Sequence, residues 1–246
     1  NTSTLQPHEL IKNYYRNNHI YNPITEEQWK QLVRDTKTIG KLGKTLVVSD
    51  VSGSMTCNKG LPLQVSIAIG ILVSQCCTCH KFQNMVMTFE NKSQFIELNE
   101  NSLLENYNKI LGMPWGGSTN LVSVFEGILE RAKLFNISNE EMPEQVIIIS
   151  DMQFDAIDDN KKTNFEYIDS LYSLAGYPRP GLIFWNVAGN TLDFPATRNS
   201  DNCALVSGFS QHIMKALVST DNLDPVSVMN EVINSHEYSK IRECLE

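Results

Sequence analysis

Three oxygen-bearing side chains occur at alternate positions of one short loop. Asp50, Ser52 and Ser54 directly follow an apolar run at residues 45–49, in the segment DVSGSM. One carboxylate and two hydroxyls with this spacing can converge on one hard cation such as Mg²⁺, Mn²⁺ or Ca²⁺, which bind oxygen ligands. Three protein oxygens leave coordination positions for water or for a group from a partner. The loop therefore predicts a divalent-cation site.

Two later segments carry side chains that can complete this site. Residues 116–120, with the sequence GGSTN, precede a predicted helix and supply the hydroxyl of Thr119. Asp151 follows a second apolar run at residues 145–150 and supplies a second carboxylate. If neighbouring parallel strands bring Asp50 and Asp151 together, the two carboxylates repel one another unless a cation or a proton lies between them. That repulsion is a physical reason to expect a metal.

Each candidate also has a purely structural explanation. The first loop can be an ordinary strand-end turn with capping hydroxyls. Thr119 can be the N-cap of the following helix, with Ser118 as the alternative ligand if the loop register shifts, and Asn120 as a further ligand-contacting candidate. Asp151 can be a capping carboxylate. Trp115 either lines the ligand surface or packs beneath it.

The elements that must position these residues alternate between strands and helices. Short apolar or β-branched runs predict strands at 45–50, 84–90, 94–98, 145–151, 181–187 and 204–207. Helical patterns occur at 25–38, 62–79, 102–111, 121–134, 163–175, 209–219, 226–233 and 238–245. The alternation predicts an α/β fold with a doubly wound, mostly parallel, Rossmann-like sheet and helices on both faces.

Three regions are expected along the chain. A helical N-terminal extension covers residues 1–43, the sheet domain covers 44–220, and a C-terminal helical extension covers 221–246. Within the first region, residues 1–23 are polar and rich in Asn, so we expect a tethering segment rather than a core element there. Open α/β sheets bind ligands at the carboxyl ends of their strands, which is where Asp50 and Asp151 are predicted.

Charge and cysteine content limit the function classes. The net charge of -8 makes the whole chain a poor polyanion binder, although residues 1–44 carry seven Lys and Arg against four acids. That basic arm could contact RNA or could be a solvated helical face. Six cysteines, three of them within residues 76–79, indicate a core cluster in a reducing compartment rather than a disulfide framework or a zinc site. No uninterrupted apolar run reaches membrane-spanning length, and no membrane partner is expected.

The sequence lacks the common motifs of phosphate-binding and hydrolytic enzymes. It contains no Gly-x-x-x-x-Gly-Lys loop and no Gly-x-Ser-x-Gly elbow. Asp50 is placed like a phosphotransfer nucleophile, but Ser52 stands where an Asp-x-Asp pattern needs a second carboxylate. These observations favour a binding protein over an enzyme.

The three loops together resemble the metal-ion-dependent adhesion site (MIDAS) of von Willebrand factor A (vWA) domains, over about residues 44–220. The resemblance implies that the first loop contributes Asp50, Ser52 and Ser54, the second contributes Thr119, and the third contributes Asp151, often through a water molecule. Many A domains continue with Asp-Gly at the third loop, whereas this chain has Met152. Asp155, slightly further on, either hydrogen-bonds a metal ligand or caps a helix.

A narrower likeness is carried by the stretches GKL, WGGST, SDMQFD, FWN and LVSGFS, which begin at residues 40, 115, 150, 184 and 205. They are similar to an uncharacterised vWA-containing family of plants and large DNA viruses, in which a helical segment precedes the A domain. A more distant likeness is to the A domain of the Ro autoantigen, an RNA-binding ring protein.

These resemblances imply a divalent-metal-dependent protein-binding module in which the cation coordinates an Asp or Glu of a protein partner. Such a module is expected to work within a larger intracellular assembly, cytoplasmic or nuclear, and it could be virus-encoded. The alternative function is binding of RNA or a ribonucleoprotein through the basic N-terminal segment. A metal-dependent hydrolase is a more remote alternative.

Overall fold

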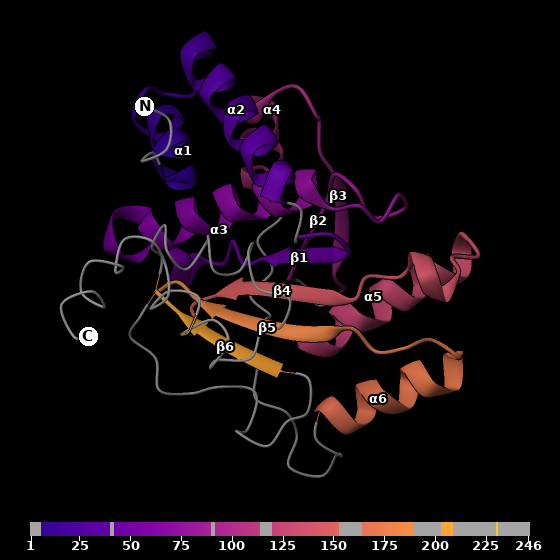
Figure 1. Cartoon of the computed structure of the whole chain (residues 1–246). Helices are drawn as coiled ribbons and strands as arrows, with labels where there is room; N and C mark the ends of the chain where they lie inside the picture. The colour runs from indigo at the N-terminus through magenta and orange to yellow at the C-terminus, as the bar shows by residue number, and fades with distance from the viewer. Residues whose placement is uncertain are drawn as a thin grey trace, which may run out of the picture.

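Six strands form one sheet in the order β3-β2-β1-β4-β5-β6. The structure is a computed structural model, and it describes residues 6–39, 42–89, 92–113, 120–152, 164–188, 203–208 and 230. Figure 1 shows the sheet running through the middle of the molecule, between two layers of helices. The strands are β1 (Thr45–Ser49), β2 (Met85–Thr88), β3 (Gln94–Glu97), β4 (Gln145–Ser150), β5 (Gly181–Asn186) and β6 (Cys203–Ser207).

The two central strands, β1 and β4, are parallel neighbours from which the chain proceeds in opposite directions across the sheet. After β1 the next strand, β2, lies on one side, and after β4 the next strand, β5, lies on the other. All pairings are parallel except that of β2 with the edge strand β3. The predicted fold class, a doubly wound and mostly parallel α/β sheet, is confirmed.

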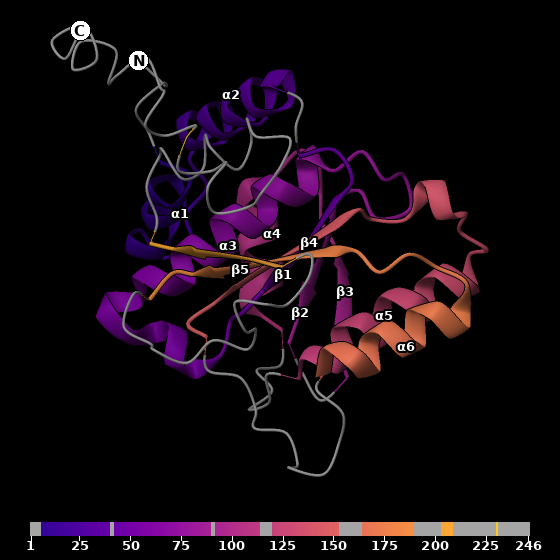
Figure 2. The same cartoon turned by 60° about the horizontal axis from the view of Figure 1, so that its bottom comes forward.

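Helices cover both faces of this sheet, as the two views in Figures 1 and 2 agree. One layer contains α1 (Pro7–Arg16), α2 (Pro23–Ile39), α3 (Cys57–Cys76) and α4 (Leu103–Leu111). The other contains α5 (Leu121–Leu134) and α6 (Asn164–Ala175), and two short 3-10 helices, η2 (Gly53–Thr56) and η3 (Asn139–Glu141), lie in connections. The predicted helices over these stretches match within a few residues at each end. The helices predicted from residue 209 onward lie outside the described residues, apart from Asn230, which is helical.

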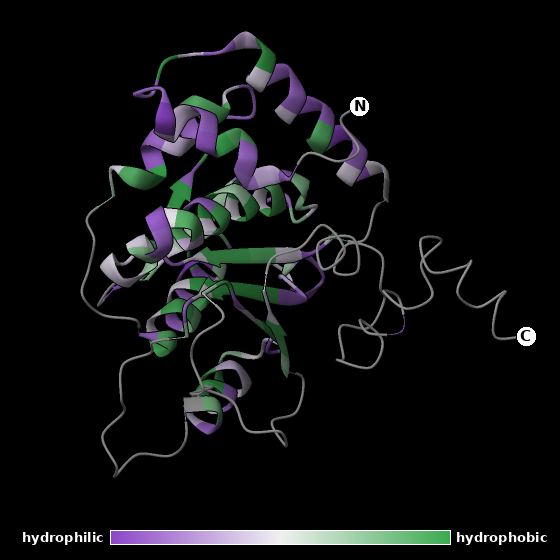
Figure 3. Cartoon of the chain, turned by 90° about the vertical axis from the view of Figure 1, so that its left-hand side faces the viewer, coloured by the Kyte–Doolittle hydropathy of each residue, from purple (hydrophilic) through white to green (hydrophobic). Residues whose placement is uncertain are grey.

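The central strands are buried on both faces, because every residue of β1 and β5 and all but the first of β4 are buried. Successive residues alternate between two separate apolar cores. Val47 and Ile147 face the core under α1–α4, whereas Leu46 and Ile148 face the core over α5 and α6. Figure 3 shows the strands in hydrophobic green and much of the peripheral helices in hydrophilic purple. Such two-sided burial explains the nearly continuous apolar runs in the sequence.

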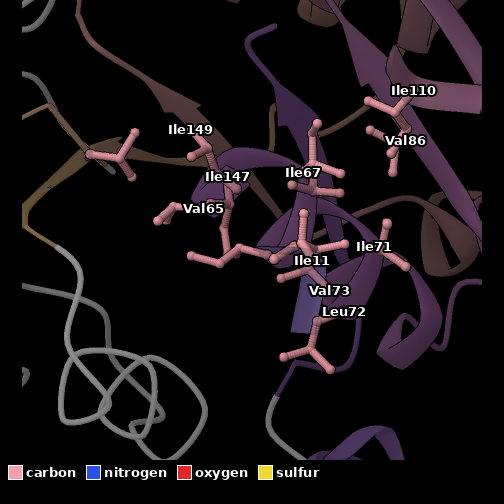
Figure 4. Packing of buried hydrophobic residues seen from close by; sticks show 14 of the residues in the cluster. Ile11, Val65, Ile67, Ile71, Leu72, Val73, Val86, Ile110, Ile147 and Ile149 are labelled. Atoms are coloured by element: carbon pink, nitrogen blue, oxygen red, sulfur yellow. The ribbon is translucent and has the colours of Figure 1, made fainter. Parts of the chain in front are cut away.

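The helix α3 packs at the centre of one layer, between the sheet and the outer helices. Figure 4 shows Ile67 and Ile71 of α3 packed among Ile11 of α1, Val86 of β2 and Ile110 of α4. Gly70 lets this helix lie directly on β1, because a Cβ at Gly70 would overlap the hydroxyl of Ser49. Within the described ranges, Gly53–Cys76 is the one helical stretch apolar and long enough to span a membrane, and 72% of its apolar part is buried inside the protein.

The first 23 residues contain a core element, so the prediction of a tethering segment there is wrong. The helix α1 begins at Pro7 with a capping box between Gln6 and Glu9. Its side chains Leu10, Ile11 and Tyr14 are at most 1% exposed and join the core under α1–α4. Full burial of such side chains stabilises a fold by roughly 1.5–3 kcal/mol each. A polar exposed face concealed this short apolar stripe in the sequence.

Candidate functional site

The two candidate carboxylates lie at the carboxyl ends of the central strands. Asp50 directly follows β1 and Asp151 directly follows β4, and Ser49 is paired with Ile149 in the parallel ladder. The backbone N–H of Asp50 continues that ladder by donating to the carbonyl of Ile149, at 2.9 Å. Both residues are buried, with 1% and 3% of their surface exposed. The prediction that neighbouring strands carry them to one edge is confirmed, and that edge, at the carboxyl ends of the strands, is where open α/β sheets bind ligands.

Both carboxylate oxygens of Asp50 accept a hydrogen bond. The backbone N–H of Ser52 donates to Oδ1 at 2.9 Å, and the hydroxyl of Ser150 donates to Oδ2 at 2.8 Å. A carboxylate oxygen can accept more than one bond. Asp50 is therefore oriented from two sides and keeps acceptor capacity on each oxygen.

The hydroxyls of Ser52 and Ser54 lie together, with their Oγ atoms 3.0 Å apart. Ser52 is the N-cap of η2, and the backbone N–H of Met55 donates to its carbonyl at 3.1 Å. This tight turn folds Ser54 back toward Ser52, and the fully buried side chain of Met55 anchors the turn in the core under α1–α4. The structure therefore brings together Asp50, Ser52 and Ser54, as the spacing predicts.

Burial makes the charged form of Asp50 unfavourable without a cation. Burial raises the pKa of the Asp50 carboxyl above its ordinary value of 3.8, hydrogen bonds from Ser52 and Ser150 lower it, and the nearby Asp151 carboxylate raises it again. None of the groups that shift this pKa is cationic. A divalent cation bound beside Asp50 would stabilise the charged carboxylate, and in this respect the site fits a metal.

The donor set suits a hard cation. The described residues contain no group of three or more His, Cys, Asp or Glu side chains that could hold a metal. A cation at this edge would therefore depend on two carboxylates and hydroxyl oxygens, a set that suits Mg²⁺ or Mn²⁺ better than zinc.

The cysteine cluster lies away from this edge. Cys76, Cys77 and Cys79 are buried at the other end of α3, where the N–H of Thr78 donates to the carbonyl of Gly43 at 2.7 Å. The predicted helix-end cysteine cluster is confirmed.

The second loop is described only at its last residue. Asn120 is the N-cap of α5, and its side-chain oxygen accepts from the N–H of Ser123 at 3.2 Å. The cap of this helix is therefore Asn120 and not Thr119. The predicted site residues that lie outside the described ranges are Trp115, Ser118, Thr119 and Asp155.

Two further residues take part in the site without having been predicted, one at the end of β4 and one in the third loop. Ser150 bonds Asp50 from the neighbouring strand, and its Oγ also accepts from the N–H of Met152 at 3.0 Å. Met152 has a φ of 66°, a left-handed conformation that L-residues with a side chain rarely adopt. Two features of the sequence could have pointed to these residues. Ser150 stands beside Asp151 at the end of an apolar run, and Met152 stands where many A domains have glycine.

Residues 44–243 match the family described as Domain of unknown function (DUF7788). A protein of Acanthamoeba polyphaga mimivirus, described as "Uncharacterized protein L728", is 33% identical over 238 residues, which are 96% of this chain and 41% of the viral protein. The expected likeness to a viral protein is thus confirmed, and this chain spans less than half of that relative's length.

A solved structure shares the fold. The Ro (RSR) protein of Deinococcus radiodurans superposes with a TM-score of 0.51 at 18% sequence identity, over 76% of this chain and 34% of that protein. At this identity the likeness concerns the fold alone, and it supports the vWA-like architecture expected from the three loops.

Proposed function

Because the chain belongs to the DUF7788 family and has a vWA-like fold, we propose that it is a divalent-cation-dependent protein-binding module. One observation carries the proposal: two buried carboxylates, Asp50 and Asp151, end the two central strands on either side of the point where the chain changes direction across the sheet. A bound Mg²⁺ or Mn²⁺ would supply an electrophilic centre that coordinates an Asp or Glu side chain of a protein partner.

The residues that would hold the ion are Asp50, Ser52 and Ser54 from the first loop, Thr119 from the second and Asp151 from the third. The hydroxyl oxygens of Ser52 and Ser54, 3.0 Å apart, already face one another within the first loop. Neutral hydroxyl ligands leave the positive charge of the cation only partly compensated, which favours an incoming carboxylate. This chemistry supports recognition of an acidic side chain rather than turnover of a substrate, and we propose no enzymatic activity.

Calorimetry on EDTA-treated protein tests the metal site. Mn²⁺ and Mg²⁺ are expected to bind the wild type at one site, and Asp50→Ala is expected to abolish this binding. Asp169→Ala is the matched control, because Asp169 is an exposed carboxylate on α6 that pairs with Arg179. Retained binding in Asp50→Ala, or none in the wild type, contradicts the proposal.

The coordinated carboxylate can be tested without knowing the partner. Acetyl-aspartate amide added to the Mn²⁺-loaded protein should displace a metal-bound water, and this lowers the water proton relaxation rate. Acetyl-asparagine amide, which lacks the charge, should leave the relaxation rate unchanged. Equal effects of the two probes would argue against carboxylate recognition. Phosphoester turnover that disappears in Asp50→Ala would instead favour the hydrolase.

RNA binding is the second candidate, and the surface of α1 and α2 is the observation in its favour. The exposed side chains there include Tyr15 and Tyr21, which are 50% and 60% exposed, together with the exposed Arg16, Arg34 and Lys37. Exposed aromatic and basic side chains are the components of single-strand recognition. Affinity for a single-stranded RNA should then fall steeply with salt, and absent or salt-insensitive binding excludes this role.

A further inference from the structure

Ser150 connects two loops of the proposed cation site through one hydroxyl group. It is the last residue of β4 and is completely buried. Its Oγ lies 2.8 Å from Oδ2 of Asp50 and 3.0 Å from the backbone nitrogen of Met152. Asp50 belongs to the first loop and Met152 to the third, so the first and third loops meet at this side chain.

The direction of these two hydrogen bonds is fixed by their donors. A backbone N–H can only donate, so Oγ of Ser150 must accept from Met152. A serine hydroxyl has one proton, and that proton is therefore free to point at Asp50. Since the Ser52 N–H holds the other oxygen of Asp50 at 2.9 Å, the carboxylate is clamped between its own loop and the neighbouring strand.

The same hydroxyl supports an unusual backbone turn after Asp151. Met152 has a φ of 66° and its side chain is buried in the core over α5 and α6. A left-handed non-glycine residue persists only where its surroundings hold it, and such residues cluster at functional sites. The hydrogen bond from the Met152 N–H to Ser150 and the burial of the Met152 side chain hold this turn. Because Asp151 lies between these two residues, the turn also fixes the backbone of Asp151.

We propose that Ser150 is a positioning residue for the cation site, which fixes the Asp50 carboxylate and the turn carrying Asp151 before the ion arrives. This inference rests on the proposed function. Groups that orient metal ligands through hydrogen bonds typically contribute 10–100-fold to metal affinity. Ser150 touches neither the ion nor a partner, and it acts through the two carboxylates.

Ser49 provides a matched control. It is the corresponding last residue of β1, is also fully buried, and its hydroxyl donates to the carbonyl of Ser66 at 3.2 Å on the opposite face of the sheet. Ser49→Ala and Ser150→Ala thus delete the same group from two neighbouring strand ends. Only the second deletion removes a bond to a candidate metal ligand.

The test is Mn²⁺ titration of the EDTA-treated full chain by calorimetry, with thermal unfolding in EDTA measured beside it. Ser150→Ala should weaken Mn²⁺ affinity by about 10–100-fold, whereas Ser150→Thr, which keeps the hydroxyl, and Ser49→Ala should stay within about threefold of the wild type. If Ser150→Ala does not fold, Ser150→Cys takes its place, since the thiol fills the space and is a poor donor.

The outcomes separate the two proposals. Wild-type affinity in a folded Ser150→Ala or Ser150→Cys protein, even one of lower thermal stability, overturns the positioning role and leaves the proposed function intact. Equal losses in Ser49→Ala and Ser150→Ala also overturn it, because the effect would then be general. A wild type that binds no Mn²⁺ refutes the proposed function and the positioning role together.

Discussion

The buried carboxylate of Glu26, on α2, accepts a hydrogen bond from the phenol of Tyr14, on α1, at 2.6 Å. The same carboxylate accepts from the backbone N–H groups of Leu103 and Leu104, at 2.8 and 3.0 Å, and so caps the first turn of α4. Burial and this hydrogen bond raise the pKa of Tyr14 far above its ordinary value. One side chain therefore ties two N-terminal helices to a helix some 77 residues later in the chain.

Glu26→Ala should destabilise the protein strongly. Three donors lose their acceptor, and each unpaired buried donor costs about 1–3 kcal/mol, so we expect a loss of at least about 3 kcal/mol in urea unfolding. Glu27→Ala is the control, because Glu27 is exposed and pairs with Lys30 at the surface, and its removal should leave the free energy of unfolding nearly unchanged. Equal losses in the two variants would mean that the cap contributes nothing.

Asp50→Asn should remove the pH dependence that the buried Asp50 carboxyl gives to the stability of the metal-free protein. Because the folded pKa of Asp50 lies above the unfolded value of 3.8, stability in EDTA falls as the pH rises from that value through the folded pKa. The asparagine does not titrate. The free energy of unfolding of the variant relative to that of the wild type should therefore increase as the pH rises above about 4, as measured by urea unfolding in EDTA. A pH-independent difference would show that burial does not penalise the Asp50 charge.

The left-handed backbone at Met152 predicts an inverted ranking of two substitutions. Both Met152→Ala and Met152→Gly lose a buried side chain, at about 2–5 kcal/mol. The glycine variant should nevertheless be the more stable, by about 0.5–1 kcal/mol, because glycine adopts a positive φ without steric cost. Met142 is equally buried but has a φ of -70°, so the alanine variant should be the more stable there. Thermal unfolding of the four variants measures the ranking at each position. The same ranking at Met152 and Met142 would show that the left-handed backbone at Met152 does not determine which variant is more stable.

Gly70 predicts a rescue experiment at the contact of α3 with β1. Gly70→Ala should cost about 1–3 kcal/mol, since the new Cβ overlaps the Ser49 hydroxyl. In a Ser49→Ala background the overlap disappears, and the substitution should become neutral or gain up to about 1 kcal/mol from better helix propensity. A double-mutant cycle by urea unfolding measures this coupling. A coupling energy of zero would show that the two residues do not touch.

Local pattern was sufficient to predict the sheet and the first loop of the site. The runs ending at Ser49 and Ser150 have the continuous apolar character of strands buried on both faces, so their ends also located Asp50 and Asp151 at one edge. The spacing of Ser52 and Ser54 predicted that their side chains point the same way, and their hydroxyl oxygens are 3.0 Å apart.

Contacts between distant segments could not be predicted in the same way. Nothing near Glu26 in the sequence identifies the N–H groups of Leu103 and Leu104 as its partners. The bond from Ser150 to Asp50 crosses 100 positions of the chain, and it depends on a strand register that periodicity does not determine. The positive φ of Met152 could not be predicted either, because methionine has no preference for a left-handed backbone.

The capping of α4 by Glu26 also bears on how this domain can be inherited. The stretch that matches the family begins at residue 44, yet Leu10, Tyr14 and Trp29 already belong to the core. The alignment with the mimivirus protein covers 96% of the chain, more than residues 44–246 can supply, so it reaches into the N-terminal helices. A gene fusion or recombination event that moved only residues 44–243 would expose an apolar face and uncap a helix. The part of this chain that packs as one folded unit is therefore longer than the stretch that matches its family.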